Sequence, residues 1–154
     1  MANNILFVSS FAEPNPVGSN RTSVSQVLAL RNLGCQISMF TCQKDQTWQG
    51  PFPTHESPKL ANIPYLALVR NGIPYHIVNF PNIWSERTLK ESEWEEAVSW
   101  GMKALTALKP KLVHLQQWQH LWWLMESAIR LGIPVVHSVN DYGMVCLRTL
   151  LITG

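Results

Sequence analysis

The chain has 154 residues, of which 46% are hydrophobic and 14% are charged, and its formal net charge is +2. This length and apolar content predict one domain with a buried core and exclude a disordered chain. A charge so small and so scattered gives no basis for a nucleic-acid partner or an anionic membrane surface. The charged fraction is well below the roughly 25% of soluble domains. It indicates either a Trp-rich domain with many neutral polar residues or a face that a partner covers.

The first residues and the cysteines predict a cytoplasmic protein. The opening sequence, MANNILFVSSFAEPNP, has no basic region and fits no secretory signal. No stretch approaches the roughly 18 apolar residues that a transmembrane segment requires. The cysteines are an odd number without C-x-x-C spacing, which argues against a disulfide framework or a zinc ribbon and predicts reduced thiols at Cys35, Cys42 and Cys146.

The first third of the chain predicts a strand, a helix and a second strand. Residues 5–9 are an apolar run followed by a turn-rich loop, which is typical of a buried strand and its exit. Apolar residues recur at helical spacing over 22–33, with Ser19 or Asn20 as the helix cap. Residues 36–42 are the second strand. The usual outcome is a parallel pair of strands joined by a right-handed crossover.

The middle of the chain predicts a long loop and then a β-hairpin. Residues 43–63 are rich in proline and have few periodic apolar residues. Two extended runs follow, at 65–70 and 73–80, and the Asn-Gly pair between them is a strong signal for a type I′ turn. Pro74 places the second run at an edge of the sheet or at its own start.

The remaining chain continues the alternation of helices and strands. The pattern Ser92-x-x-Glu95 predicts a helix start, and this helix runs to residue 108, where Pro110 stops it. A strand at 112–117, an aromatic-rich helix at 118–131 and a strand at 134–139 follow. We therefore expect an α/β fold with a Rossmann-like, doubly wound, mostly parallel sheet and a β-hairpin insertion.

Ligands of such sheets bind outside the carboxyl ends of the strands. The segment after the first strand leads into a helix N-terminus, where free N–H groups and the helix dipole favour phosphate. It contains only one glycine, Gly18, so it matches neither the dinucleotide nor the Walker pattern. Gly18 either approaches a phosphate or serves a turn that needs its backbone alone.

Other candidate residues have structural alternatives of similar or greater weight. Asp141, at a strand end, orients a substrate hydroxyl, acts as a base, or belongs to an ordinary turn. His114 and His137 lie within predicted strands, where packed core histidines are the commoner case. Helical spacing favours core or interface packing over sugar stacking for Trp118, Trp122 and Trp123. No catalytic triad, Cys/His pair or metal-ligand cluster stands out in the sequence.

Several segments in this order resemble the N-terminal domain of the family 4 retaining glycosyltransferases of the GT-B fold: ILFVSSFAEPNPVGS, LRNLGCQISMFT, NGIPYHIV, LKPKLVHLQQ and IRLGIPVVHSVNDYGMVCLR. The resemblance covers nearly the whole chain. It implies two Rossmann-like domains that face each other across a cleft. The N-terminal one receives the acceptor, and the C-terminal one holds most of a nucleoside diphosphate sugar.

The resemblance assigns roles by matching position. It places Gly18 in the loop that approaches the donor phosphate, and Asn140 to Tyr142 in a segment that usually reads His-Asp-Tyr. Ser19 replaces a second glycine of the loop. Asn140 replaces a histidine that touches the donor hexose, and an asparagine, unlike a histidine, cannot carry a proton near neutral pH. The implied catalytic residues are Asn140 and Asp141, and the implied phosphate-binding or substrate-binding residues are Gly18, Ser19, Asn20, Arg21, His114, Gln116, Tyr142 and Arg148.

The expected function is therefore hexosyl transfer with retention, from a nucleoside diphosphate sugar to a sugar, lipid or small-molecule acceptor. No metal and no other cofactor is implied. We expect residues 1–154 to be one acceptor-side domain of a truncated enzyme that is inactive without its C-terminal donor-binding domain. The alternative is a non-catalytic Rossmann-like module that binds a partner protein or self-associates, and a small nucleotide-binding hydrolase or epimerase-like domain is a weaker third option.

Overall fold

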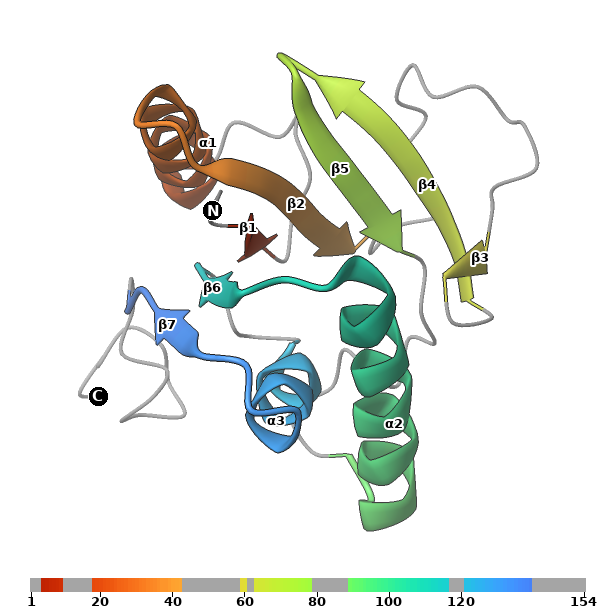
Figure 1. Ribbon diagram of the computed structural model, residues 1–154. Helices are drawn as coiled ribbons and strands as arrows, with labels where there is room; N and C mark the ends of the chain where they lie inside the picture. Colours follow the sequence, from red (N-terminus) through yellow and green to blue (C-terminus); the bar gives the residue numbers. More distant parts are fainter. Residues whose placement is uncertain are drawn as a thin grey trace, which may run out of the picture.

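The computed structural model describes residues 4–9, 18–42, 59–60, 63–78, 89–116 and 121–139. They form an α/β fold in which helices flank a sheet (Figure 1). The strands are β1 (Asn4–Ser9), β2 (Gln36–Cys42), β3 (Lys59–Leu60), β4 (Ile63–Arg70), β5 (Ile73–Val78), β6 (Leu112–Leu115) and β7 (Val135–His137). The helices are α1 (Gly18–Asn32), α2 (Glu91–Leu108) and α3 (Trp122–Arg130).

The sheet has the order β3-β4-β5-β2-β1-β6-β7. Strands β5, β2, β1, β6 and β7 are parallel, whereas β4 runs antiparallel to both β5 and β3. From β1 the chain first adds strands on one side, β2 to β5, and then adds β6 and β7 on the other side, so the sheet is doubly wound. The predicted fold class, a mostly parallel sheet with an inserted hairpin, is confirmed.

The helices lie on opposite sides of the sheet, α1 on one side and α2 with α3 on the other (Figure 1). We call these sides the α1 face and the α2–α3 face. Alternate residues of β1 supply both cores, because successive side chains of a strand point to opposite faces. Leu6 and Val8 pack with residues of α2 and α3, whereas Ile5 and Phe7 pack with Val27 of α1.

The predicted hairpin turn is confirmed. Asn71 and Gly72 have φ values of 51° and 71°, as a type I′ turn requires at both of its central positions. The Arg31 guanidinium donates a hydrogen bond to the Asn71 carbonyl and so joins the last turn of α1 to the hairpin. Pro74 lies at the start of β5, which is an inner strand between β4 and β2, so the edge position is excluded.

Two predicted helix starts are wrong. Helix α1 begins at Gly18, so Ser19 and Asn20 lie within its first turn and do not cap it from outside. Polar residues are tolerated in the first turn of a helix, whose N–H groups have no partner within the helix. The prediction relied on apolar spacing, which begins only after this polar turn, and therefore placed the start too late. In α2, the Lys90 N–H donates to Glu93 Oε2 at 2.9 Å, and Ser92 is already helical.

Helices α2 and α3 pack closely on the sheet and on each other. The rings of Trp100 and Trp123 meet edge to face, with centroids 5.4 Å apart, and Trp123 is 1% exposed. Gly101 lies against Ser127, whose Oγ is 2.9 Å from the Val98 carbonyl oxygen. Core packing is therefore confirmed for Trp122 and Trp123, while Trp118 lies outside the described residues.

Candidate functional site

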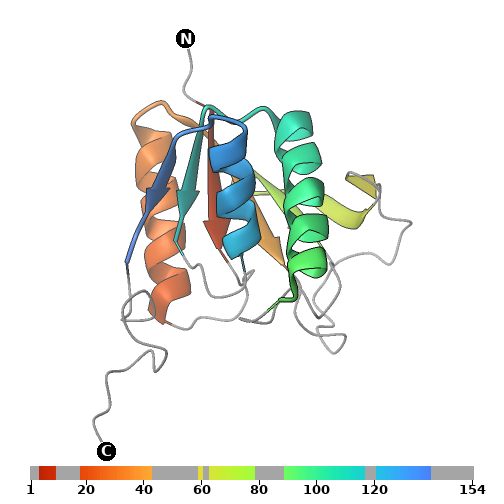
Figure 2. The same ribbon diagram turned by 90° about the horizontal axis from the view of Figure 1, so that it is seen from below.

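The parallel strands all end at one edge of the sheet, and helices α1, α2 and α3 all begin there (Figure 2). The helix N-termini differ in charge, because the first turns of α1 and α3 have no acidic residue whereas that of α2 has two. The first turn of α2 carries Glu91 and Glu93, whose carboxylates already offset the positive end of the helix dipole. The first turn of α1 contains no acidic residue. The first turn of the 15-residue α1 therefore adds no negative charge to the positive end of its dipole, which favours an anion at this edge.

A row of uncharged polar side chains crosses the sheet at the same edge. Ser9 pairs in register with Thr41 on β2. On the other side of β1, the Gln116 N–H donates to the Val8 carbonyl at 2.9 Å, and the Ser138 N–H donates to the Leu115 carbonyl at 2.8 Å. These bonds continue the parallel ladders by one residue. We call Thr41, Ser9, Gln116 and Ser138 the polar row.

The polar row lies on the α1 face. Ser9 follows Ile5 and Phe7 in the alternation of β1, and both of these residues belong to the core that α1 covers. Thr41 has the same relation to Met39 on β2. Because α1 begins at this edge, its N-terminal turn and the polar row share one side and one end of the sheet.

Three members of the polar row are almost fully buried. Ser9 and Gln116 are 1% exposed, and Thr41 is 0% exposed. Among the described residues, none offers a hydrogen bond to Thr41 Oγ1. A buried hydroxyl costs free energy when it has no partner, so the partner of Thr41 Oγ1 is to be sought outside the described residues, in the chain or in a ligand.

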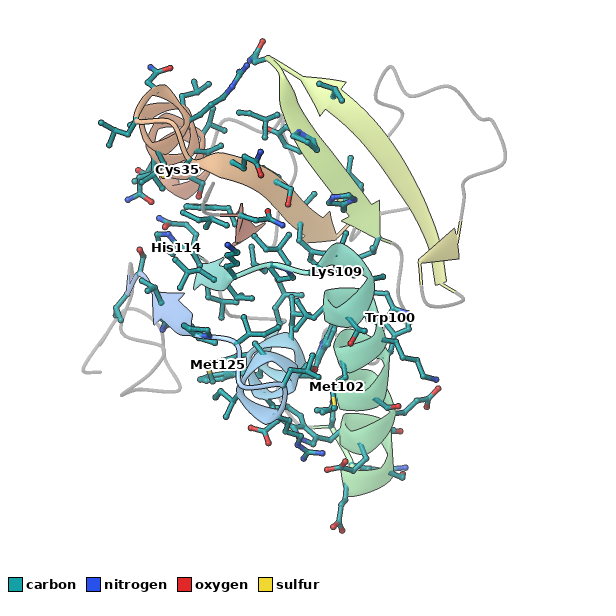
Figure 3. All side chains as sticks on the ribbon, viewed as in Figure 1. Cys35, Trp100, Met102, Lys109, His114 and Met125 are labelled. Carbon is teal, nitrogen blue, oxygen red and sulfur yellow. The ribbon has the colours of Figure 1, made fainter. Side chains whose placement is uncertain are left out.

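His114, labelled in Figure 3, is an ionisable side chain close to the polar row, because it stands two residues before Gln116 and on the same face of the sheet. Its ring packs on Phe7, with centroids 4.4 Å apart, and its Nε2 lies 2.8 Å from Ser138 Oγ. Burial lowers the pKa of His114, and the positive charge of protonated His137 lowers it further. His114 is therefore a neutral hydrogen-bonding group at neutral pH.

The structure brings several of the predicted site residues to this edge. Gly18 is the first residue of α1, and Ser19, Asn20 and Arg21 complete its first turn. His114 and Gln116 lie at the end of β6 on the same face. The other predicted residues, Asn140, Asp141, Tyr142 and Arg148, lie outside the described residues.

Sequence reasoning placed Ser9 only within the strand-end segment 9–21 and named none of Ser9, Thr41 and Ser138 as an individual site residue. A signal was present, because the predicted strands end in or next to small polar residues in SSF, FTC and HSV. Each of these residues alone is an ordinary strand end. Only the order of the strands in the sheet, which places Thr41, Ser9 and Ser138 in one line with Gln116, distinguishes them.

Two further properties concern ions and membranes. Within the residues that the structure describes, no cluster of His, Cys, Asp and Glu side chains is arranged to hold a metal ion. None of the helices in the described ranges is long and apolar enough to cross a membrane.

The chain is similar to known proteins in its sequence family and in its fold. A family model described as a glycosyl transferase 4-like domain matches residues 17–150. A search of curated protein sequences finds no significant match. Among solved structures, the chain resembles trehalose-6-phosphate synthase from E. coli bound with UDP-2-fluoro glucose, at 12% identity and a TM-score of 0.52. The match covers 90% of this chain and 33% of that one.

A second similar structure is the catalytic domain of starch synthase IV from Arabidopsis thaliana bound to ADP and acarbose. It has 14% identity and a TM-score of 0.52, and the match covers 92% of this chain and 34% of that chain. The present chain thus spans about a third of the length of each neighbour. At this level of identity the likeness establishes the fold, which is that of one Rossmann-like half of a GT-B protein.

Proposed function

Because the chain belongs to the family of glycosyl transferase 4-like domains, we propose that it is the acceptor-side domain of an enzyme that transfers a hexosyl group from a nucleoside diphosphate sugar. The transfer proceeds with retention of the anomeric configuration. The acceptor is a sugar, a lipid or a small molecule. The chain spans about a third of its structural neighbours, so we assign most contacts to the nucleotide to a further domain and expect the isolated chain to be inactive.

One observation carries this proposal, namely the position of the α1 N-terminus beside the polar row. A nucleoside diphosphate sugar has an anionic diphosphate next to an uncharged ring of hydroxyl groups. The N-terminal turn of α1 offers N–H donors and the positive end of the helix dipole to the diphosphate, and that turn has no carboxylate to compete with it. The hydroxyl and amide groups of the polar row place neutral hydrogen-bonding groups at the same end of the sheet, and the partly exposed Ser138 is the most accessible of them to the sugar ring.

The same arrangement suits the chemistry of transfer. The bond between the anomeric carbon and the diphosphate oxygen breaks, and negative charge collects on the leaving phosphate. The acceptor's hydroxyl oxygen forms the new bond to the anomeric carbon, and its proton is taken up by the departing nucleoside diphosphate. N–H groups at Gly18 and the residues after it stabilise that charge more in the transition state than in the bound donor. Asn140 and Asp141 then position hydroxyl groups of the hexose. The Asn140 amide hydrogen-bonds without exchanging a proton, so it acts by orientation alone.

The direct test uses the protein that contains this sequence, purified from its own cells with an antibody against residues 43–63. The purified protein is incubated with UDP-glucose, ADP-glucose or GDP-mannose and with a panel of sugar and lipid acceptors. Acceptor-dependent release of a nucleoside diphosphate is the expected result, and NMR of the product should show the anomeric configuration of the donor. An inverted product contradicts retention, and no release with any donor favours a non-catalytic module.

Gly18→Val tests the phosphate role of the α1 N-terminus. A branched side chain at the first helical residue obstructs the approach of a phosphate to the N–H groups, so transfer should be lost. The thermal melting curve should stay unchanged. Ala29→Val is the matched control, because Ala29 is exposed in the same helix. Normal kinetics in the Gly18→Val protein would remove this helix from the mechanism.

A further inference from the structure

The exit of β7 is held by two bonds at one residue. β7 is an edge strand of the described sheet, and it pairs with β6 only from Val135 to His137. Directly after it, the Ser138 N–H donates to the Leu115 carbonyl at 2.8 Å. The Ser138 hydroxyl is also bonded to His114 Nε2, at 2.8 Å. A short edge strand is easily frayed, so this second bond restrains the chain where the ladder ends.

The His114 ring is itself restrained. It packs on Phe7 with an angle of 54° between the ring planes, and burial keeps it neutral. A neutral imidazole has one N–H and one acceptor nitrogen, and the contact with Ser138 occupies Nε2. His114 therefore acts on the chain through Ser138 in this arrangement, from a ring that the inner strand β1 holds in place.

We propose that His114 and Ser138 are positioning residues, which fix the direction in which the chain leaves β7 toward Asn140 and Asp141. Asn140 is the second residue after Ser138 in the sequence. A shift of the backbone at Ser138 therefore has only one intervening residue in which to be absorbed before Asn140. This inference rests on the proposed function for its catalytic consequence. The bond between His114 and Ser138 can be tested independently of that function.

The first test is native-state hydrogen exchange of the Ser138 amide in the 154-residue chain. Loss of the side-chain bond, in Ser138→Ala or in His114→Phe, should speed exchange at position 138 about fivefold, the scale of one hydrogen bond. His114→Phe keeps an aromatic ring against Phe7 and removes the nitrogen. His114→Gln and Ser138→Thr retain a bonding group and should restore slow exchange. Ser99→Ala, on the exposed side of α2, is the control.

A double-mutant cycle makes this test decisive. If the two side chains act through one bond, the protein with both Ser138→Ala and His114→Phe should exchange no faster at position 138 than either single variant. Effects that multiply, to about twenty-five-fold, would overturn the proposal because the residues would then act independently. Unchanged exchange in both single variants would overturn it as well.

The second test is kinetic and uses the enzyme purified for the transfer assay. Ser138→Ala should lower kcat about tenfold or more, because a misplaced reacting group slows the chemical step, and His114→Phe, which removes the other partner of the same bond, should lower kcat by a similar factor. Ser138→Thr should recover kcat. A change in KM alone would overturn the positioning role. No transfer by the unsubstituted enzyme would overturn the proposed function, whereas the exchange cycle would still decide whether the bond exists.

Discussion

The two faces of the sheet differ in the kind of side chain that they bury. On the α2–α3 face, large apolar side chains such as Phe40, Trp100 and Trp123 fill the space between the sheet and two helices. The α1 face is apolar from its amino end, where Ile5, Ile37 and Ile73 lie, to its centre. Its carboxyl end carries the buried polar row, and Val136, in register with His114 on β7, is 46% exposed. The apolar packing on the α2–α3 face therefore stabilises the fold. The carboxyl end of the α1 face has buried polar side chains in place of apolar ones, at the position where we expect a ligand, and contributes less to stability.

The largest expected effect comes from Trp123→Ala, which removes an aromatic side chain from the α2–α3 face. Trp123 is 1% exposed and contacts Trp100, so the substitution leaves a cavity that the core cannot fill. It should lower the free energy of unfolding by about 3–5 kcal/mol, as measured by urea denaturation. A loss comparable to that of an exposed substitution such as Ser99→Ala would show that this face does not dominate stability.

Gly101→Ala probes the same face with an added methyl group. A Cβ at position 101 would overlap Ser127 Oγ, because α2 and α3 approach closely at this point. The helices must move apart, which should cost about 1–3 kcal/mol of unfolding free energy although Ala is the better helix former. Ala107→Gly, at an exposed position of α2, separates helix propensity from packing. A stabilised Gly101→Ala protein would contradict the close approach.

The pH dependence of stability should report on the histidines. Burial lowers the pKa of His76 below the usual 6.5, and burial and the His137 charge do the same for His114. Below pH 6.5 these histidines bind protons in the unfolded chain but stay neutral in the folded chain. The free energy of unfolding should therefore fall as the pH falls. His114→Gln should make this slope shallower in denaturation curves. Stability that rises on acidification would contradict the buried, neutral state of His114.

The smallest effect on stability is expected for Thr41→Val, which compares function with folding on the α1 face. Thr41 Oγ1 has no hydrogen-bond partner among the described residues, and valine has nearly the same shape. The free energy of unfolding should therefore stay unchanged or rise, while the KM for the donor increases. A clear loss of stability would mean that the Thr41 hydroxyl supports the fold and not a ligand.

Much of the fold follows from local signals in the sequence. The Asn-Gly pair predicted the hairpin between β4 and β5, and Pro110 marked the end of α2 correctly. Helix starts were harder to predict. Ser19 and Ser92 have the chemistry of helix caps, but that chemistry is also tolerated inside a first turn, and the bond from Lys90 to Glu93 is not part of a Ser or Thr pattern.

The candidate site could be predicted only in part. The sequence placed Gly18, His114 and Gln116 at strand or helix ends, and the parallel sheet brings those ends to one edge. The polar row needed the strand order and the register, because Thr41 and Gln116 are far apart in the sequence and never neighbours on one element. The bond between His114 and Ser138 likewise depends on the tertiary placement of β6 beside β7.

The central claim is that the carboxyl end of the α1 face binds the donor, and an NMR titration tests it most directly. The ¹⁵N-labelled protein that contains this sequence is titrated with UDP-glucose and ADP-glucose, and the amide shifts of residues 1–154 are followed. The account predicts saturable shifts that gather at the first turn of α1, at Gln116 and at Ser138, with Trp100 and Trp123 unaffected. Shifts confined to the α2–α3 face, or none at saturating donor, would contradict it.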